Sequence, residues 1–181
     1  MNAELLAMLT AKTSSFELSS NNHDAVTSED IAHYLGTKGL NSTEYDFLMA
    51  KYTDNTYSMS LVFDNIYQDI FDIFKKNIDL KKLKDNRFLL RHFINLALRE
   101  TMYPNCFICQ GRGTVINNER IQKCQHCEGT GQFIYNDNNR PEFLGIEKKE
   151  FIKFKVPYMK SLDYIKNIES SALDKIGDEQ T

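Results

Sequence analysis

Long apolar runs are missing from this 181-residue chain, and proline and glycine are scarce, at three and eight copies. The sequence has no run of eighteen or more apolar residues, which argues against a transmembrane helix. The low proline and glycine content argues against a low-complexity segment, and 41% hydrophobic with 26% charged residues is typical of a globular domain. The first residues, Met1 to Glu4, lack the basic segment of a signal peptide. We therefore expect a soluble cytoplasmic protein with no membrane contact.

Patterns typical of enzyme active sites are also missing. The sequence shows no paired carboxylates for acid–base work, no Ser/His/Asp arrangement and no glycine-rich phosphate loop. We therefore predict that the chain is not an enzyme.

Positive charge is scarce in the first part of the chain. Residues 1–74 carry three basic side chains against eleven acidic ones, whereas residues 110–166 carry ten basic against seven acidic. The net charge of −3 argues against a uniformly basic DNA-binding protein. The asymmetry favours two surfaces with different partners, although a solvated acidic face is the simpler alternative.

The four cysteines all belong to one eight-residue pattern, C-x-x-C-x-G-x-G, which occurs twice. The first copy runs from Cys106 to Gly113 and the second from Cys124 to Gly131. Two C-x-x-C pairs at this separation can supply four thiolates to one tetrahedral zinc ion. The glycines suit a backbone that turns sharply around a metal. We therefore predict one structural zinc per chain, held by Cys106, Cys109, Cys124 and Cys127, with a short β-hairpin between the pairs.

Other interpretations of the cysteines fit less well. Two disulfides would need an oxidising compartment, and a redox C-x-x-C pair normally follows a strand in a βαβ unit. His126 and Glu128 match the H-x-E of zinc deaminases, but they lie inside the second pair rather than before the first. We expect His126 to be a surface residue and not a ligand.

Apolar periodicity and capping residues predict a mainly α-helical fold. Thr27 fits the N-cap of one helix and Ser42-Thr43 that of the next. Gly36 fits a helix C-cap, and Leu144-Gly145-Ile146 resembles the turn of a helix-turn-helix. Predicted helices cover 27–36, 42–52, 58–76, 85–100, 141–144, 147–154 and 157–176. We expect a partly flexible N-terminal arm (1–26), a helical region (27–101), an inserted zinc ribbon (102–135) and helix-turn-helix-like C-terminal helices (136–181).

The chain resembles the late-gene antitermination proteins Q of lambda-like bacteriophages, from about Thr27 to about Ile176. The resemblance includes the segment Asp30-Ile31-x-x-x-Leu35-Gly36, the doubled cysteine pattern, and Leu144-Gly145 with Pro157-Tyr158 downstream. Similar cysteine pairs occur in the zinc module of DnaJ chaperones. There the pattern usually appears four times, with a His-Pro-Asp triplet elsewhere, which this sequence lacks.

The resemblance implies a non-enzymatic transcription factor in a bacterial host cell. Such proteins bind a DNA element near a phage late promoter and load onto paused RNA polymerase. They contact the polymerase β flap and the primary sigma factor, and they let polymerase pass terminators. A plain DNA-binding regulator and a DnaJ-like zinc interaction module are the alternatives.

Two sets of residues are expected to make these contacts. For the acidic half we predict contact with polymerase, or with a second copy of the chain, through Glu44 and Asp46. The predicted DNA-binding residues are basic side chains in and after the ribbon: Arg112, Arg120, Lys123, Arg140, Lys148, Lys149, Lys153 and Lys155.

Overall fold

The structure is a computed structural model that describes residues 27–53, 55–78, 87–103, 105–106, 108–117 and 120–177. The predicted arm over 1–26 lies outside the described residues. The chain forms two compact units, and each is described by itself. Within the described ranges, no helix combines the length and apolar character needed to cross a lipid bilayer.

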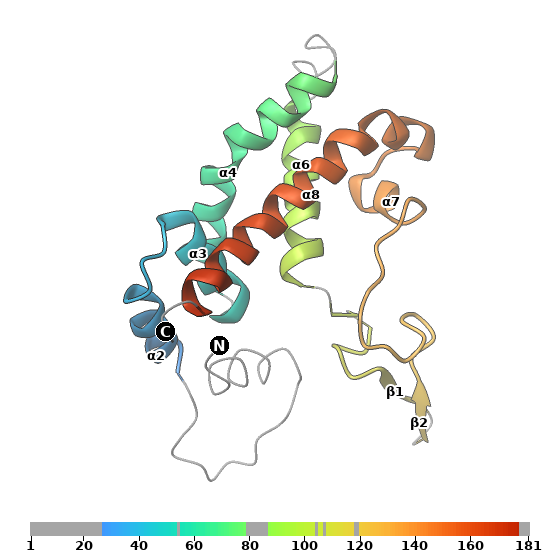
Figure 1. Cartoon of the computed structure of the whole chain (residues 1–181). Coiled ribbons are helices and arrows are strands. Elements are labelled where there is room, and N and C mark those ends of the chain that lie inside the picture. The colour runs from blue at the N-terminus through green and yellow to red at the C-terminus, as the bar shows by residue number, and fades with distance from the viewer. Residues whose placement is uncertain are drawn as a thin grey trace. The chain divides into compact units, whose positions relative to one another are not determined.

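The larger unit is helical and comprises 40–103 and 135–173. It contains α3 (Ser42–Thr53), α4 (Thr56–Asn77), α6 (Arg87–Met102), α7 (Arg140–Leu144) and most of α8 (Lys148–Gly177), coloured from cyan to red in Figure 1. Together with the hairpin described below, these elements confirm the predicted mainly α-helical fold.

The core of this unit forms where the apolar stripes of its helices meet. On α4, Val62, Ile66 and Ile70 recur every fourth residue and are fully buried. The ring of Phe93 on α6 lies at the centre of an aromatic cluster. Its centroid is 5.3 Å from that of Phe74 on α4, and the rings of Phe151, Phe154 and Tyr158 on α8 surround it at 5.3–6.3 Å. These contacts join α4, α6 and α8 around one core.

Side-chain caps begin the first two described helices. The cap predicted at Thr27 is confirmed, because Thr27 and Asp30 form a reciprocal capping box before α2 (Ser28–Gly36). The predicted C-cap at Gly36 is wrong by one residue: the helix includes Gly36, and Thr37 caps it. The cap of α3 also differs from the predicted Ser42-Thr43. Asn41 accepts from the backbone N–H of Glu44.

The C-terminal helix contradicts the prediction of two helices separated near Pro157. Instead α8 is continuous from Lys148 to Gly177, with Pro157 inside it. A proline in a helix interior removes one backbone hydrogen bond. Phe154 and Tyr158 are both buried against Phe93, one turn apart on either side of the proline. This shared packing holds the two halves of the helix in line.

The smaller unit contains α2 and the cysteine ribbon. In the ribbon, β1 (Thr114–Asn117) pairs antiparallel with β2 (Arg120–Lys123), with Thr114 opposite Lys123. The predicted hairpin between the cysteine pairs is therefore confirmed. Ile116 faces Ile121 across the hairpin, and both are largely exposed. The hairpin thus has no apolar core of its own, and the four buried cysteines with Val115 form the small core of the ribbon.

Candidate metal centre

The four cysteines converge on one point, as their spacing predicts. All four are buried, none is in a disulfide, and their Sγ atoms lie within 4.8 Å of one another. The Sγ atoms of Cys106 and Cys124 are 4.0 Å apart, and those of Cys109 and Cys127 are 3.6 Å apart. Four thiolates at the usual zinc–sulfur distance of about 2.3 Å would be about 3.8 Å apart. The cluster therefore has the size needed to hold one metal ion.

The two copies of the pattern build the same turn. In the first copy, the N–H of Gly113 donates to Cys109 Sγ at 3.3 Å, and in the second, the N–H of Gly131 donates to Cys127 Sγ at the same distance. Each copy also places the residue after its second cysteine in the left-handed region, with φ of 52° at Gln110 and 51° at Glu128. N–H groups aimed at the sulfurs stabilise thiolates.

The last glycine of each copy sits where the two turns meet. The N–H of Cys124 donates to Gly113 O at 2.9 Å, and the N–H of Cys106 donates to Gly131 O at 2.8 Å. A Cβ atom on Gly113 would lie 2.4 Å from Gly129 O, and one on Gly131 would lie 2.2 Å from Gly111 O. Glycine is therefore required at both positions by close backbone approach as well as by positive φ.

The thiols of Cys106 and Cys127, one from each copy, differ in pKa because hydrogen bonds offset the effect of burial to different extents. Burial raises the pKa of Cys106 to about 11. At Cys127 burial also opposes ionisation, but hydrogen bonds from Gly131 and from neighbouring groups outweigh it and lower the pKa to about 7. Binding of a metal ion would require all four thiols to be deprotonated, so the affinity should rise with pH.

His126 lies outside the cluster, as predicted. Its side chain is exposed, and its ring stacks on Phe133 with a centroid distance of 5.1 Å. Among the described residues, the only group that could hold a metal consists of the four cysteines. A four-thiolate centre leaves no coordination position for water, so its role would be structural.

Three of the predicted DNA-binding residues belong to the ribbon. Arg120 and Lys123 are exposed on β2. Arg112 is also exposed, and its Nε donates to Cys109 O at 3.1 Å. Arg112 therefore supports the first turn around the metal centre, and Arg120 and Lys123 carry the accessible positive charge of the hairpin.

Arg140 does not fit the predicted DNA-binding role. Its side chain is buried, with 8% of the residue exposed. It makes a bidentate ion pair with Glu100 on α6, with Nη2–Oε1 and Nε–Oε2 distances of 2.6 and 3.1 Å. The hydroxyl of Tyr158 donates to the same carboxylate at 2.9 Å. Because its guanidinium is occupied by Glu100, Arg140 fixes α7 against α6 and is not available to a phosphate group.

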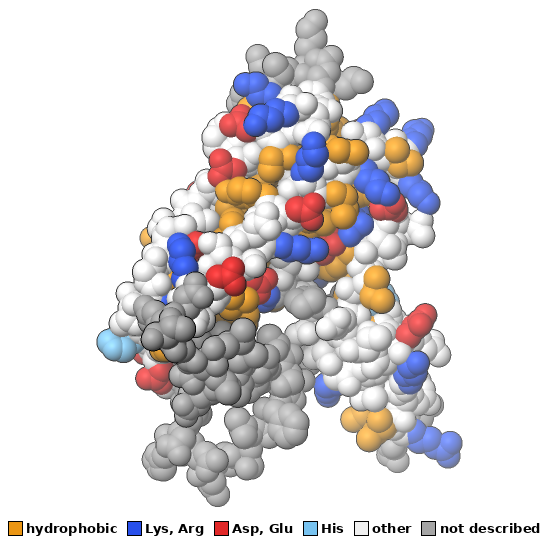
Figure 2. Space-filling view, in the orientation of Figure 1, with side chains coloured by type: hydrophobic (Ala, Val, Ile, Leu, Met, Phe, Trp, Pro, Cys, Tyr) orange, Lys and Arg blue, Asp and Glu red, His pale blue; other side chains and the backbone are white. Residues whose placement is uncertain are grey.

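The four predicted lysines of α8 lie near its beginning, in the larger unit. Lys148 donates to Asn138 Oδ1 at 2.7 Å, Lys149 pairs with Glu147 at 2.6 Å, and Lys155 pairs with Asp137. Lys153 is exposed and has no hydrogen-bond or ion-pair partner among the described residues. Exposed pairs of this kind contribute little stability, about 0–1 kcal/mol, so these lysines can exchange their partners for phosphates. Figure 2 shows blue side chains gathered where α8 begins.

The prediction that Glu44 and Asp46 form a protein-binding surface is also wrong, because both side chains are buried. Glu44 is 4% exposed and Asp46 is 8% exposed. The Glu44 carboxylate accepts from the N–H of Asn41 at 2.9 Å and from the hydroxyl of Ser171 on α8 at 2.8 Å. Burial raises the pKa of Asp46, although Ser58 hydrogen bonds to it. Both acids hold α3 in place within the unit.

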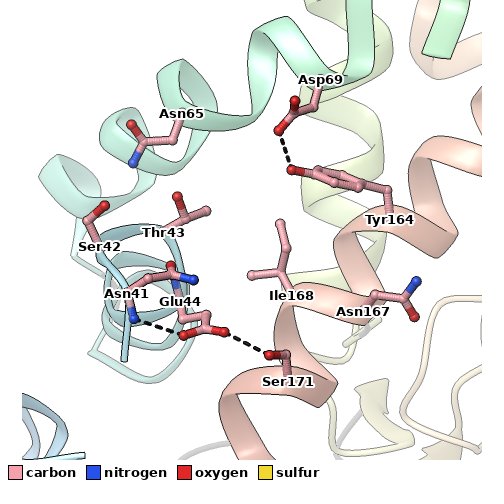
Figure 3. A pocket seen from close by; sticks show the side chains of 10 residues that line it. All are labelled: Asn41, Ser42, Thr43, Glu44, Asn65, Asp69, Tyr164, Asn167, Ile168 and Ser171. Carbon is pink, nitrogen blue, oxygen red and sulfur yellow. Dashed lines mark hydrogen bonds between the residues drawn. The ribbon is translucent and has the colours of Figure 1, made fainter. Parts of the chain in front are cut away.

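The contacts of Glu44 form part of a polar pocket that the sequence did not indicate. The pocket has a volume of about 370 Å³ and lies among the start of α3, the middle of α4 and the later part of α8. Figure 3 shows Glu44 reaching Ser171 on one side and Asp69 accepting from the Tyr164 hydroxyl on the other. These partners are about 100 positions apart in the chain, so no local pattern could have revealed them.

Comparison with known proteins provides no independent assignment. No protein-family model, curated protein sequence or solved structure matches this chain.

Proposed function

We propose that the four-cysteine centre binds one zinc ion per chain. Four thiolate donors in a tetrahedral arrangement suit Zn²⁺, which has no geometric preference of its own and favours sulfur ligands. The ion would join two turns that otherwise share only backbone hydrogen bonds and an exposed hairpin. Its contribution is structural.

Elemental analysis of protein purified without chelator tests the zinc assignment directly, with one zinc per chain as the expected result. Cys124→Ser should lose the metal and the ribbon structure. Most helical circular dichroism should remain, because the helices of the larger unit bury their own aromatic core. Absence of zinc, or stoichiometric iron in its place, would contradict the assignment.

We further propose that the chain is a transcription antitermination factor that binds double-stranded DNA and acts on bacterial RNA polymerase. The observation that carries the DNA-binding part is the exposed face of the first half of α8. It has five lysines and one acid between 148 and 160. It follows the short helix α7 and the left-handed turn at Gly145, where φ is 66°. A helix presented after such a turn can enter the major groove.

The resemblance of the sequence to phage Q proteins supports the step beyond DNA binding. The doubled cysteine pattern and the Leu144-Gly145 turn, on which the resemblance rests, both occur in ordered parts of the fold. In this proposal the protein binds near a late promoter, loads onto a paused polymerase through its β flap and primary sigma factor, and travels with it past terminators.

The acidic part of the chain remains the proposed site of polymerase contact, but through different residues from Glu44 and Asp46. Asp64 is exposed on α4, and Asp72 follows it at a spacing of eight residues on the same side of the helix. An acidic helix surface would repel DNA phosphates and could pair with basic groups of a protein.

A purified transcription system tests the antitermination proposal. The template carries a promoter, a promoter-proximal pause and a downstream terminator, and the readout is the fraction of transcripts that pass the terminator. The zinc-loaded protein should raise this fraction. DNA binding without read-through would leave a plain DNA-binding regulator as the better function.

Two variants separate the DNA contact from the polymerase contact. Asp64→Lys with Asp72→Lys should bind DNA normally and fail to load on paused polymerase. Lys148→Ala with Lys149→Ala should reduce both DNA binding and read-through. If the aspartate variant retains full read-through, these acids are merely solvated.

A further inference from the structure

Two large aliphatic side chains are exposed on α8 in the middle of its lysines. Ile152 is 60% exposed and Val156 is 59% exposed, and the two lie one helical turn apart. The opposite face of the same turns carries Phe151, Phe154 and Tyr158, which are buried in the core. A single exposed aliphatic residue is ordinary, but two of them on adjacent turns of a charged helix face indicate a surface that a partner covers.

The lysines flank this pair on both sides. With 3.6 residues per turn, Lys148 and Lys160 continue the row of Ile152 and Val156 at its two ends, because all four are spaced by four residues. Lys155 lies on one side of this row, and Lys149 and Lys153 lie on the other. In Figure 2 blue side chains surround an orange one where α8 begins. The helix therefore presents a small apolar pair with lysines on both sides and at both ends.

We propose that this face of α8 reads thymine methyl groups in the major groove, through Ile152 and Val156. This inference rests on the proposed DNA binding and adds a base preference to it. The major groove admits an α-helix and is bordered by two phosphate backbones, toward which the lysines on the two sides of the pair can point. Isoleucine and valine can make no hydrogen bond, and the thymine C5-methyl is the apolar group on the major-groove edge.

The spacing of the two residues predicts the spacing of the thymines. Side chains four residues apart on a helix are separated by about 6 Å along its axis. Base pairs are spaced by about 3.4 Å along the duplex. When the helix lies along the groove, Ile152 and Val156 reach methyl groups about two base-pair steps apart. A protein partner would instead need acidic groups around an apolar strip.

The test uses the full-length, zinc-loaded protein. DNA duplexes that bind to it are first selected from a pool of random sequences. Thymines in the selected site are replaced one at a time by deoxyuridine, which removes the C5-methyl alone. Dissociation constants are measured by fluorescence anisotropy. The wild-type protein should bind about fourfold more weakly for each contacted methyl that is removed. Ile152→Ala with Val156→Ala should bind the thymine duplex more weakly and lose no further affinity with deoxyuridine.

Lys149→Ala is the matched control on the same helix face. It should weaken binding to thymine and deoxyuridine duplexes in parallel, keep the methyl effect and reduce the salt slope by about 0.9. Unchanged melting temperatures would show that these exposed substitutions leave the fold intact.

The outcomes distinguish this inference from the proposed function. If the wild-type protein binds no duplex, the proposed DNA binding itself fails. If it binds DNA without a deoxyuridine effect, or the Ile152/Val156 variant keeps that effect, thymine reading is overturned while DNA binding stands. If the variant binds DNA like the wild type but loses association with RNA polymerase, the face is a protein-docking surface and the inference is wrong.

Discussion

The close approach of the two cysteine turns makes Gly113→Ala the sharpest test of the proposed metal centre. The new Cβ atom would lie 2.4 Å from the carbonyl oxygen of Gly129, which is part of the backbone and cannot swing away. The residue would also have to keep a φ of 73°. Relief of the clash must move the two turns apart and with them the cysteines that they carry.

The cost of this substitution has two parts. A left-handed conformation costs a residue other than glycine about 1–2 kcal/mol. Separating the turns strains the two hydrogen bonds that join them, from Cys124 N–H to Gly113 O and from Cys106 N–H to Gly131 O, at about 0.5–1.5 kcal/mol each. The total of about 2–5 kcal/mol corresponds to a zinc affinity reduced by about 30-fold or more. Gly131→Ala should behave alike, because its Cβ would lie 2.2 Å from Gly111 O.

Two other glycines separate backbone strain from the clash. Gly145 has a φ of 66° with no heavy atom within 4 Å of an added Cβ, so Gly145→Ala should cost only about 1–2 kcal/mol and leave zinc affinity unchanged. Gly36 ends α2 with neither a positive φ nor a close neighbour. Gly36→Ala should be neutral or stabilising by up to about 1 kcal/mol.

Zinc affinity is measured by competition with a chromophoric chelator, and stability by thermal unfolding of the loaded protein. We expect the zinc affinities of Gly113→Ala and Gly131→Ala to be far lower than those of the wild type and of the control variants Gly145→Ala and Gly36→Ala. If Gly113→Ala binds zinc as tightly as Gly145→Ala does, the close approach of the turns does not support the metal centre and the reasoning fails.

Three further predictions concern the larger unit. Lys148→Ala with Lys149→Ala should reduce the log–log salt slope of DNA binding by about 1.8, at about 0.9 for each phosphate that the variant no longer neutralises; an unchanged slope would place the DNA-binding surface elsewhere. Glu100→Gln removes the partner of the buried Arg140 guanidinium and should lower the free energy of unfolding by on the order of 3–5 kcal/mol, measured by urea denaturation. Burial raises the pKa of Asp46 above its ordinary value of 3.8. Between the two pKa values the folded state therefore keeps a proton that the unfolded state has released, and the free energy of unfolding falls as the pH rises through that window. Asp46→Asn should therefore raise the melting temperature at pH 7, with a smaller gain below pH 4; an equal effect at both pH values would rule out this cause.

The cysteine ribbon could be predicted almost entirely from the sequence. Its candidate ligands, turns and hairpin all lie within residues 105–132. Each turn depends on residues of its own copy of the pattern, and the hairpin depends on residues 114–123 between the cysteine pairs. A C-x-x-C-x-G-x-G segment bends back on itself because the N–H of its last glycine donates to the cysteine sulfur four positions earlier. The glycines within it reflect the same local geometry, so a doubled pattern specifies a doubled turn. The capping box at Thr27 was predictable for the same reason.

The roles of individual charged residues depended on tertiary structure. Arg140 belongs to the more basic part of the sequence, but its partner Glu100 lies 40 positions earlier, on another helix. Glu44 has the sequence surroundings of a surface acid, but Ser171 meets it from 127 positions away. A charge is an interaction site only where water or a partner can reach it, and that depends on which helices pack together.

Pro157 and the exposed pair Ile152 and Val156 on α8 also separate what the local sequence predicts from what tertiary packing decides. The local rule ends a helix near a proline, but the packing of Phe154 and Tyr158 around Phe93 outweighs the loss of one hydrogen bond. The sequence marks Ile152 and Val156 only as apolar. Because Phe93 takes up the aromatic face of α8, the fold leaves these two side chains facing water. Local chemistry determined the four-cysteine cluster, and the packing of distant helices decided which side chains of α8 remain available to a partner.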